Sequence, residues 1–262
     1  MKLKGFYSSL VAIAIPISLQ TLLQNLINIH NTIMIGRLGS LEIAAVGLGN
    51  QIFFILNMIL FGITSGGGVF IAQFWGKKDI CGIRKSLGLM TVIAIFTSVI
   101  FTILGLFIPH KMISLYSPDP QVIQVGGTYL RYVCLSYIPT AISFSITLAL
   151  RSTERVKLPL VCTAISLSIN LIANYLLIFV AGLGVKGAAI ATIIARFIEL
   201  FILVIWSYSH KYEICGKLKE HLGYNKNFVF KYIKIALPVI INETLWGLGT
   251  SIYNAIFAHA GT

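Results

Sequence analysis

The chain has 262 residues, of which 57% are hydrophobic and only 11% are charged. Soluble domains carry about 25% charged and about 45–50% apolar residues, so this composition excludes a soluble enzyme, and its richness in Leu, Ile, Val and Phe excludes a disordered chain. The net charge of +12 does not indicate a nucleic-acid binder, because the Lys and Arg residues form short clusters between long apolar runs. We therefore expect an integral membrane protein.

Seven apolar runs are long enough to cross a bilayer as helices, which requires about 20 residues each. These runs greatly exceed the about 10 residues of a membrane β-strand, so we predict an all-α, polytopic membrane helix bundle. The first run follows the N-terminus without a clear cleavage site of small residues, and we interpret it as a span and not as a removed signal peptide. The predicted spans are residues 9–36, 43–75, 86–109, 122–149, 158–182, 187–208 and 232–258.

The positive charges between the spans predict an orientation. If the N-terminus is cytoplasmic, fifteen Lys and Arg residues fall in cytoplasmic segments and three in external ones. Cytoplasmic loops of membrane proteins carry an excess of Lys and Arg. We therefore expect a multi-pass protein of the plasma (inner) membrane with a cytoplasmic N-terminus.

The longest polar stretch, from His210 to Lys231, separates six spans from the seventh. Six positions recur 222 residues later, among them Pro16 as Pro238, which indicates a second lobe built as a parallel repeat of the first. The expected units are an amino-terminal six-helix lobe at 1–208, a cytoplasmic linker at 209–231 and the first helix of a truncated carboxy-terminal lobe at 232–262.

Ionisable residues inside spans are costly, so each is a candidate functional residue. Glu243 in the seventh span is a candidate for binding a cation or a proton, or a neutral acid hydrogen-bonded between helices. His30 in the first span is either a packing histidine or a titrating group. Arg196 and Glu199 are three residues apart on the sixth span and share a helix face, so we predict a structural ion pair.

Several amides also lie at membrane depth. Asn31 in the first span and Asn170 and Asn174 in the fifth could hold helices together or coordinate an ion, and the residues alone favour packing. We find no nucleophile–base pair, phosphate-binding loop or metal-ligand spacing. The sequence therefore predicts no enzyme activity, no cofactor and no metal site.

Five segments, taken in order, resemble the multidrug and toxic compound extrusion (MATE) family of secondary transporters. Each resembles a stretch of one of the family's first seven helices or of the loop between helices four and five, and together they cover nearly the whole chain. The segments are NTIMIGRLG (Asn31–Gly39), NQIFFILNMILFGITSGGGVFIAQFWGKKD (Asn50–Asp79), LRSTERVKLPL (Leu150–Leu160), GVKGAAIATIIARFIE (Gly184–Glu199) and NETLWGLG (Asn242–Gly249).

The resemblance implies a twelve-helix antiporter of two six-helix lobes that exports organic cations and other amphipathic compounds in exchange for Na+ or H+. Its partners would be the lipid bilayer and the small-molecule substrate. By motif, the coupling-ion site of the amino-terminal lobe would comprise Asn31, Asn170, Asn174 and Thr192. Glu243 matches an acidic residue of helix seven implicated in cation or substrate binding, and His30 is a second candidate for substrate contact.

This chain departs from the family at the coupling site. The family usually carries an aspartate where this chain has Asn31, and some members carry one at Asn174. An amide releases no proton in the working pH range and offers a cation no full negative charge. Coupling through a carboxylate therefore shifts towards Glu243, although the amides could still provide neutral oxygen ligands for sodium.

The chain also stops at Thr262, five helices short of the family's twelve. We expect a truncated half, either an excerpt of a longer protein or a truncated product, whose missing partner is the carboxy-terminal lobe. Two other functions remain open. One is a flippase for lipid-linked oligosaccharides from the same superfamily, and the other is a seven-helix membrane receptor.

Overall fold

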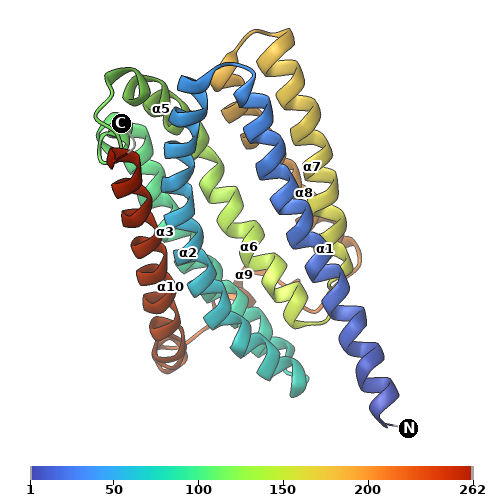
Figure 1. Ribbon diagram of the computed structural model, residues 1–262. Helices are drawn as coiled ribbons and strands as arrows, with labels where there is room; N and C mark the ends of the chain where they lie inside the picture. Colours follow the sequence, from blue (N-terminus) through green and yellow to red (C-terminus); the bar gives the residue numbers. More distant parts are fainter. Residues whose placement is uncertain (1, 261–262) are drawn as a thin grey trace.

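The computed structural model describes the backbone of residues 2–260 and the side chains of residues 10–254 and 256. This part of the chain is a bundle of long helices without a β-strand, and the helices run up and down beside one another (Figure 1). Six of the described helical segments are long and apolar enough to cross a membrane. The structure thus confirms the predicted all-α membrane bundle.

The six spans follow the predicted order. They are α1 (Lys2–Gly36), α2 (Ser40–Gly76), α3 (Ile80–Phe107), α5 (Pro120–Val133) continued through the short η1 (Cys134–Ser136) into α6 (Tyr137–Ser152), α7 (Lys157–Asn174) continued by the wider turn η2 (Tyr175–Val180), and α8 (Gly184–Ser209).

The remaining helices are two short ones and one long one: α4 (Pro109–Ser114), α9 (Leu218–Leu222) and α10 (Lys226–Ala260). α10 contains the seventh predicted span but lies outside the set of six. Its first turns carry Lys226, Lys231 and Lys234, and Glu243 lies near its middle. Residues 1, 261 and 262, at the ends of the predicted units, lie outside the described residues.

Capped turns start two of the spans. The Asp79 side chain accepts a hydrogen bond from the backbone N–H of Gly82 at 2.9 Å and so caps α3. Asp119 caps α5 in the same way, and Pro120 at the first helical position needs no hydrogen-bond acceptor there. These residues satisfy backbone groups that the helix itself leaves unpaired.

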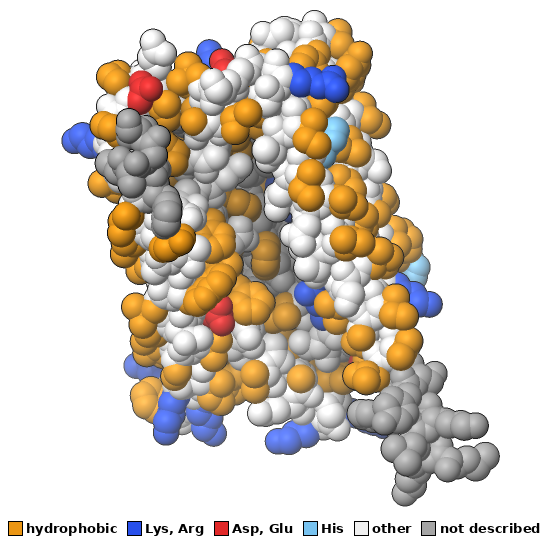
Figure 2. All heavy atoms as spheres, in the orientation of Figure 1, with side chains coloured by type: hydrophobic (Ala, Val, Ile, Leu, Met, Phe, Trp, Pro, Cys, Tyr) orange, Lys and Arg blue, Asp and Glu red, His pale blue; other side chains and the backbone are white. Residues whose placement is uncertain are grey.

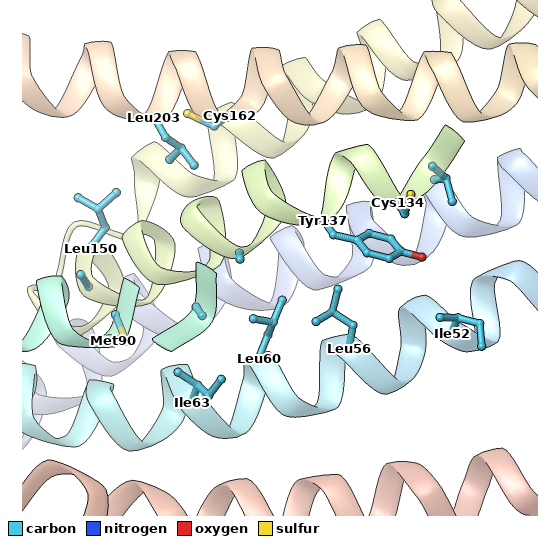
Figure 3. Close-up of a cluster of buried hydrophobic side chains, with 14 of the residues drawn as sticks. Ile52, Leu56, Leu60, Ile63, Met90, Cys134, Tyr137, Leu150, Cys162 and Leu203 are labelled. Atoms are coloured by element: carbon cyan, nitrogen blue, oxygen red, sulfur yellow. The ribbon is translucent and has the colours of Figure 1, made fainter. Parts of the chain in front are cut away.

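The core is centred on α2. Ile52, Leu56, Leu60 and Ile63 recur at intervals of three and four residues and are almost completely buried. In Figure 3 they face Tyr137 of α6 and side chains of the neighbouring helices. Lipid tails are as apolar as these side chains, so close van der Waals packing between the helices stabilises the bundle more than exclusion of water does.

Three consecutive glycines of α2 permit close approach on three sides. A Cβ on Gly66 would lie 2.6 Å from the Cβ of Ala236 of α10, and Cβ atoms on Gly67 and Gly68 would meet side chains of α3 and α6 at 2.5 and 2.8 Å. At Gly66 the backbone of Ala236 leaves no room for a Cβ, so only glycine fits, whereas at Gly67 and Gly68 the side chains of Met90 and Leu148 would have to shift. The glycines therefore let α2 contact three helices at one level.

α10 is held against α2 by more than small residues. The Tyr232 hydroxyl donates to the carbonyl of Ile63 of α2 at 3.0 Å. Near its other end α10 contacts the turn between α4 and α5, where the hydroxyls of Tyr116 and Ser251 lie 2.7 Å apart. Figure 1 shows α10 on the side of α2 away from α1. The helix thus covers the outside of the six-span bundle and leaves the space between α1 and α2 free.

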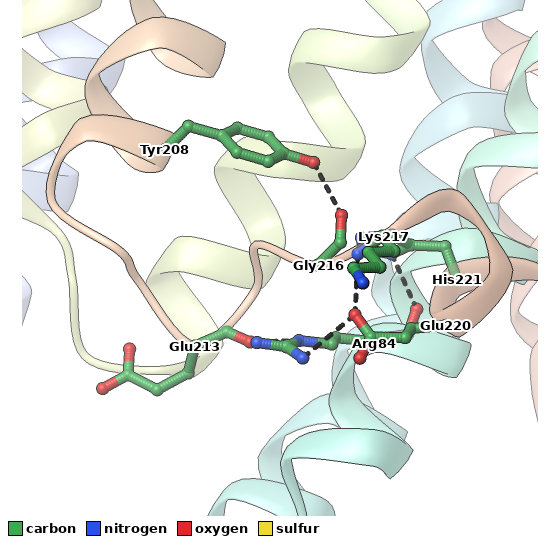
Figure 4. Close-up of polar contacts among 7 residues, drawn as sticks. All are labelled: Arg84, Tyr208, Glu213, Gly216, Lys217, Glu220 and His221. Atoms are coloured by element: carbon green, nitrogen blue, oxygen red, sulfur yellow. Dashed lines mark hydrogen bonds and ion pairs between the residues drawn. The ribbon is translucent and has the colours of Figure 1, made fainter.

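The predicted linker is folded and packs against the first turns of α3 (Figure 4). Arg84 Nη1 lies 3.1 Å from Glu220 Oε2, and Arg84 Nε donates to the carbonyl of Glu213 at 3.2 Å. The Arg84 carbonyl lies 3.1 Å from His221 Nδ1, and Glu220 also accepts from the backbone N–H of Lys217 at 2.7 Å. Arg84 therefore holds both the linker segment before α9 and α9 itself.

A second arginine ties the linker to the loop between α6 and α7. Arg155 Nη2 lies 3.0 Å from Glu213 Oε1, and its guanidinium lies 5.1 Å from the ring centre of Tyr212. Burial raises the pKa of Glu213, but the hydrogen bond and charge of Arg155 outweigh burial and hold this pKa below its ordinary value. Burial lowers the pKa of His221. These linker contacts are thus arranged for an ionised Glu213 and a neutral His221.

Candidate functional site

A cavity of about 380 Å³ opens between α1 and α2 and reaches α5, α7 and α8. In Figure 2 the surface is hollowed between the segments that Figure 1 labels α1 and α2. Amide side chains are concentrated on its wall, together with hydroxyl groups and Arg196. The amides are Asn28, Asn31, Asn50, Gln51, Asn57 and Asn170.

Three asparagines form a hydrogen-bonded cluster at this cavity. Asn174 Nδ2 donates to Asn31 Oδ1 at 2.7 Å and to Asn170 Oδ1 at 3.0 Å. Asn170 and Asn174 lie one turn apart on α7, so they share the face that packs against α1. Asn170 and Asn174 are almost fully buried, and Asn174 Oδ1 has no hydrogen-bond partner among the described residues.

Thr192, the fourth residue implied by the resemblance, lines the same cavity from α8. Its hydroxyl donates to the carbonyl of Ala188 on its own helix at 3.0 Å. The structure therefore places all four implied coupling residues at or next to one cavity. Hydrogen bonds link three of them, Asn31, Asn170 and Asn174.

Glu243 and His30 lie elsewhere. Glu243 is half-buried on α10, does not line the cavity, and has no hydrogen-bond or ion-pair partner in the part of the chain that the structure describes. His30 precedes Asn31 on α1 but does not line the cavity either. Its Nε2 is buried and has no hydrogen-bond partner among the described residues. The candidate residues are thus divided between the amide cavity and two separate positions.

The predicted pair of Arg196 and Glu199 belongs to a longer polar chain. Arg196 Nη1 lies 2.8 Å from Glu199 Oε2, and the Thr163 hydroxyl donates to Glu199 Oε1 at 3.4 Å. Gln20 Nε2 donates to Thr163 at 2.9 Å, and Arg151 Nη2 donates to Gln20 Oε1 at 2.7 Å. This chain connects α8, α7, α1 and α6 below the amide cavity.

Gln20 and Thr163, in the middle of this chain, were not predicted from the sequence. Gln20 is 1% exposed, and its only signal is a polar side chain inside the first apolar run. Such a residue must find a partner at membrane depth, because no water is available there. A search for isolated polar residues in the spans would have found Gln20 and Thr163.

The chemistry of the amide cavity differs from that of the chain below it. Amide oxygens are hard, neutral ligands of the kind that bind alkali and alkaline-earth cations, but they do not release protons. Glu199 has a carboxylate, but Arg196 neutralises its charge. No cluster of three His, Cys, Asp or Glu side chains that could hold a metal ion occurs among the described residues.

A protein-family model described as MatE matches residues 16–176. The probable multidrug resistance protein YoeA of Bacillus subtilis is 24% identical over 98% of this chain and 57% of its own length. The probable multidrug resistance protein NorM of Thermotoga maritima is 27% identical over 96% of this chain and 55% of its own length. The multidrug and toxin extrusion protein 1 of Rattus norvegicus is 29% identical over 79% of this chain and 38% of its own length.

Solved structures show the same fold. A MOP superfamily transporter from Pyrococcus furiosus matches with a TM-score of 0.81 at 19% identity, over 90% of this chain and 52% of that one. An outward-facing multidrug resistance MATE family transporter matches with the same TM-score and coverage. The chain thus spans about half the length of the proteins it matches.

Proposed function

The chain belongs to the MatE family, and on this premise we propose that it forms the amino-terminal lobe of a secondary transporter that exports organic cations and other amphipathic drugs by antiport with Na+ or H+. Relatives named as multidrug resistance and extrusion proteins support drugs as the substrate class. The half-length match supports a second lobe as the partner in alternating access.

The asparagine cluster carries the proposal for the coupling ion. Asn174 gives both amide protons to its neighbours, and its own oxygen faces none of the described donors. A cation that replaces these hydrogen bonds would meet the side-chain oxygens of Asn31, Asn170 and Asn174. Because no group in the cluster can titrate, this site suits Na+ and not H+.

Ethidium efflux from membrane vesicles that contain this lobe together with the second lobe of the transporter tests both parts of the proposal. We expect an imposed Na+ gradient to drive efflux, and we expect Asn31→Leu to raise the Na+ concentration for half-maximal efflux about tenfold, as the loss of one good ligand would. Asn25→Leu is the matched control, since Asn25 is exposed on the same helix. Efflux driven only by a pH gradient would contradict the sodium site, and absence of efflux under either gradient would contradict drug transport.

A further inference from the structure

A second, smaller cavity of about 80 Å³ lies beside the chain from Arg151 to Arg196. It is lined by α1, α2, α6 and α8, and Arg196 also lines the amide cavity. A water molecule in the liquid occupies about 30 Å³, so this volume accommodates one small ion or a few waters. The two cavities thus share a single guanidinium.

The charges on the wall of the small cavity do not balance. Its lining includes Arg151, Arg196 and Glu199. Glu199 pairs with Arg196, whereas the side chain of Arg151 has one hydrogen-bond partner among the described residues, the neutral amide oxygen of Gln20 at 2.7 Å. No carboxylate of the described residues forms an ion pair with Arg151. Arg151, in the last turn of α6 and partly buried, therefore has no negatively charged partner among the described residues.

Two hydrogen-bond donors on the same wall lack acceptors. Arg151 Nε is buried without a partner, and so is the hydroxyl of Ser143, which lies two turns earlier on α6 and is 5% exposed. A guanidinium can only donate, so Arg151 Nε requires an acceptor. An acceptor that also carries negative charge would satisfy both donors and the charge imbalance.

We propose that this cavity binds a small anion held by Arg151 and Ser143. The anion is either a halide or a small free oxyanion such as acetate or inorganic phosphate. The site lies below the amide cluster, towards the end of the bundle where α6 ends and α7 begins. The inference does not rest on the proposed function, because it concerns binding and not transport.

The experiment measures thermal unfolding of the purified, detergent-solubilised protein. Sodium chloride, bromide, acetate or phosphate replaces sodium gluconate, which is too large for the cavity, at constant Na+ concentration and ionic strength. We expect at least one of the small anions to raise the melting temperature in a saturable manner. Stabilisation by chloride and bromide alone identifies a halide, and stabilisation by acetate or phosphate identifies a small oxyanion.

Two variants test whether the anion that raises the melting temperature binds in this cavity. In Ser143→Ala we expect the half-saturating anion concentration to rise about tenfold, as for the loss of one hydrogen bond to a charged partner. Ser168→Ala is the matched control, because this exposed serine bonds only to its own helix. Arg151→Gln should abolish the effect, and Ser143→Ala decides the matter if that variant does not fold.

Two results would overturn the inference. If no small anion stabilises the protein more than gluconate does, the cavity holds only water. If anions stabilise wild type and Ser143→Ala with the same half-saturating concentration, the anion binds elsewhere. A bromide-soaked crystal provides an independent test, since anomalous scattering should show a peak between Arg151 and Ser143.

Discussion

Asn174 illustrates how one atom changes the chemistry of a membrane site. A carboxylate at this position would bring a negative charge, and its neighbours could not both accept hydrogen bonds from it. The amide instead donates to Asn31 and Asn170 and closes the cluster in the absence of an ion. A neutral site of this kind should bind cations more weakly than an acidic one, since affinity rises with the number of charged ligands.

Glu243 is the residue whose replacement we expect to stop transport without unfolding the protein. Glu243 lies on α10 and has no hydrogen-bond or ion-pair partner among the described residues, so its carboxyl group remains available to a cationic substrate or coupling ion. In a protein that carries both lobes, we expect Glu243→Gln to abolish cation-coupled efflux of ethidium and to change the stability by less than about 0.5 kcal/mol, as is usual for sites without partners. Vesicle efflux and thermal unfolding measure the two effects.

Glu154→Gln is the control for this substitution, because Glu154 is exposed in a loop. Efflux by Glu243→Gln at the wild-type rate would show that this carboxylate takes no part in transport. A large loss of stability would instead indicate that Glu243 is a structural residue.

The residues differ in how far the sequence could predict them. Asn31 lies in a segment with family resemblance, and the resemblance implied its grouping with Asn170 and Asn174. Gln20 and Thr163 are 143 residues apart, and their contact depends on which face of α1 meets α7. Nothing in an apolar run specifies this face, because in lipid the outside of a helix is as apolar as the inside.

Among the elements, the linker departs most from its sequence pattern. Its polar composition marked a connection between lobes, but the pattern did not predict that it folds onto α3. The contact depends on Arg84 in the first turns of α3, more than 120 residues away in the chain. Likewise, apolarity alone did not reveal the break at η1, because that turn is as apolar as the helices it joins.

The linker contact should weaken in acid. Since the pKa of His221 is lowered from its ordinary value of 6.5, the unfolded linker takes up a proton before the folded one does. Stability of the contact therefore falls as the pH drops below 6.5, and it falls further below 4.5 as the Glu213 carboxyl, whose pKa is also lowered, is protonated. Hydrogen–deuterium exchange of residues 213–223, corrected for intrinsic rates, should show faster exchange at pH 5.5 than at pH 7.5.

His221→Asn should remove the part of this pH dependence between pH 5.5 and 7.5. His210→Asn should leave it unchanged, because His210 contacts Trp206 and Tyr212 and not α3. Equal pH dependence in wild type and in His221→Asn would refute the role of His221.

At the scale of the whole molecule, the charge pattern and the helix order predict which end faces the cytoplasm. Cys81 is an exposed free cysteine at the start of α3, and Lys111 lies beyond the opposite end of that helix. In a variant with Cys81 as the only cysteine, we expect a membrane-impermeant maleimide to label inside-out vesicles but not intact cells.

A variant with the single cysteine at position 111 should show the opposite pattern. Labelling of Cys81 in intact cells would reverse the predicted orientation. The fold class itself needed no such test, because seven apolar runs in a weakly charged chain leave few alternatives to a helical bundle. The sequence did not predict that α10 packs on the outer side of α2, since that contact depends on the small residues at one level of both helices.

The packing of α10 on α2 has a consequence for biosynthesis. Tyr232 contacts the carbonyl of Ile63, 169 residues earlier in the chain. At about 5–20 residues per second, the ribosome needs roughly 10 to 30 s to synthesise the chain from Ile63 of α2 to Tyr232 of α10. Gly62 and Gly66 form a Gly-x-x-x-Gly pattern, which attracts other membrane helices. During that interval the nascent α2 is the part of the chain most exposed to pairing with a wrong helix.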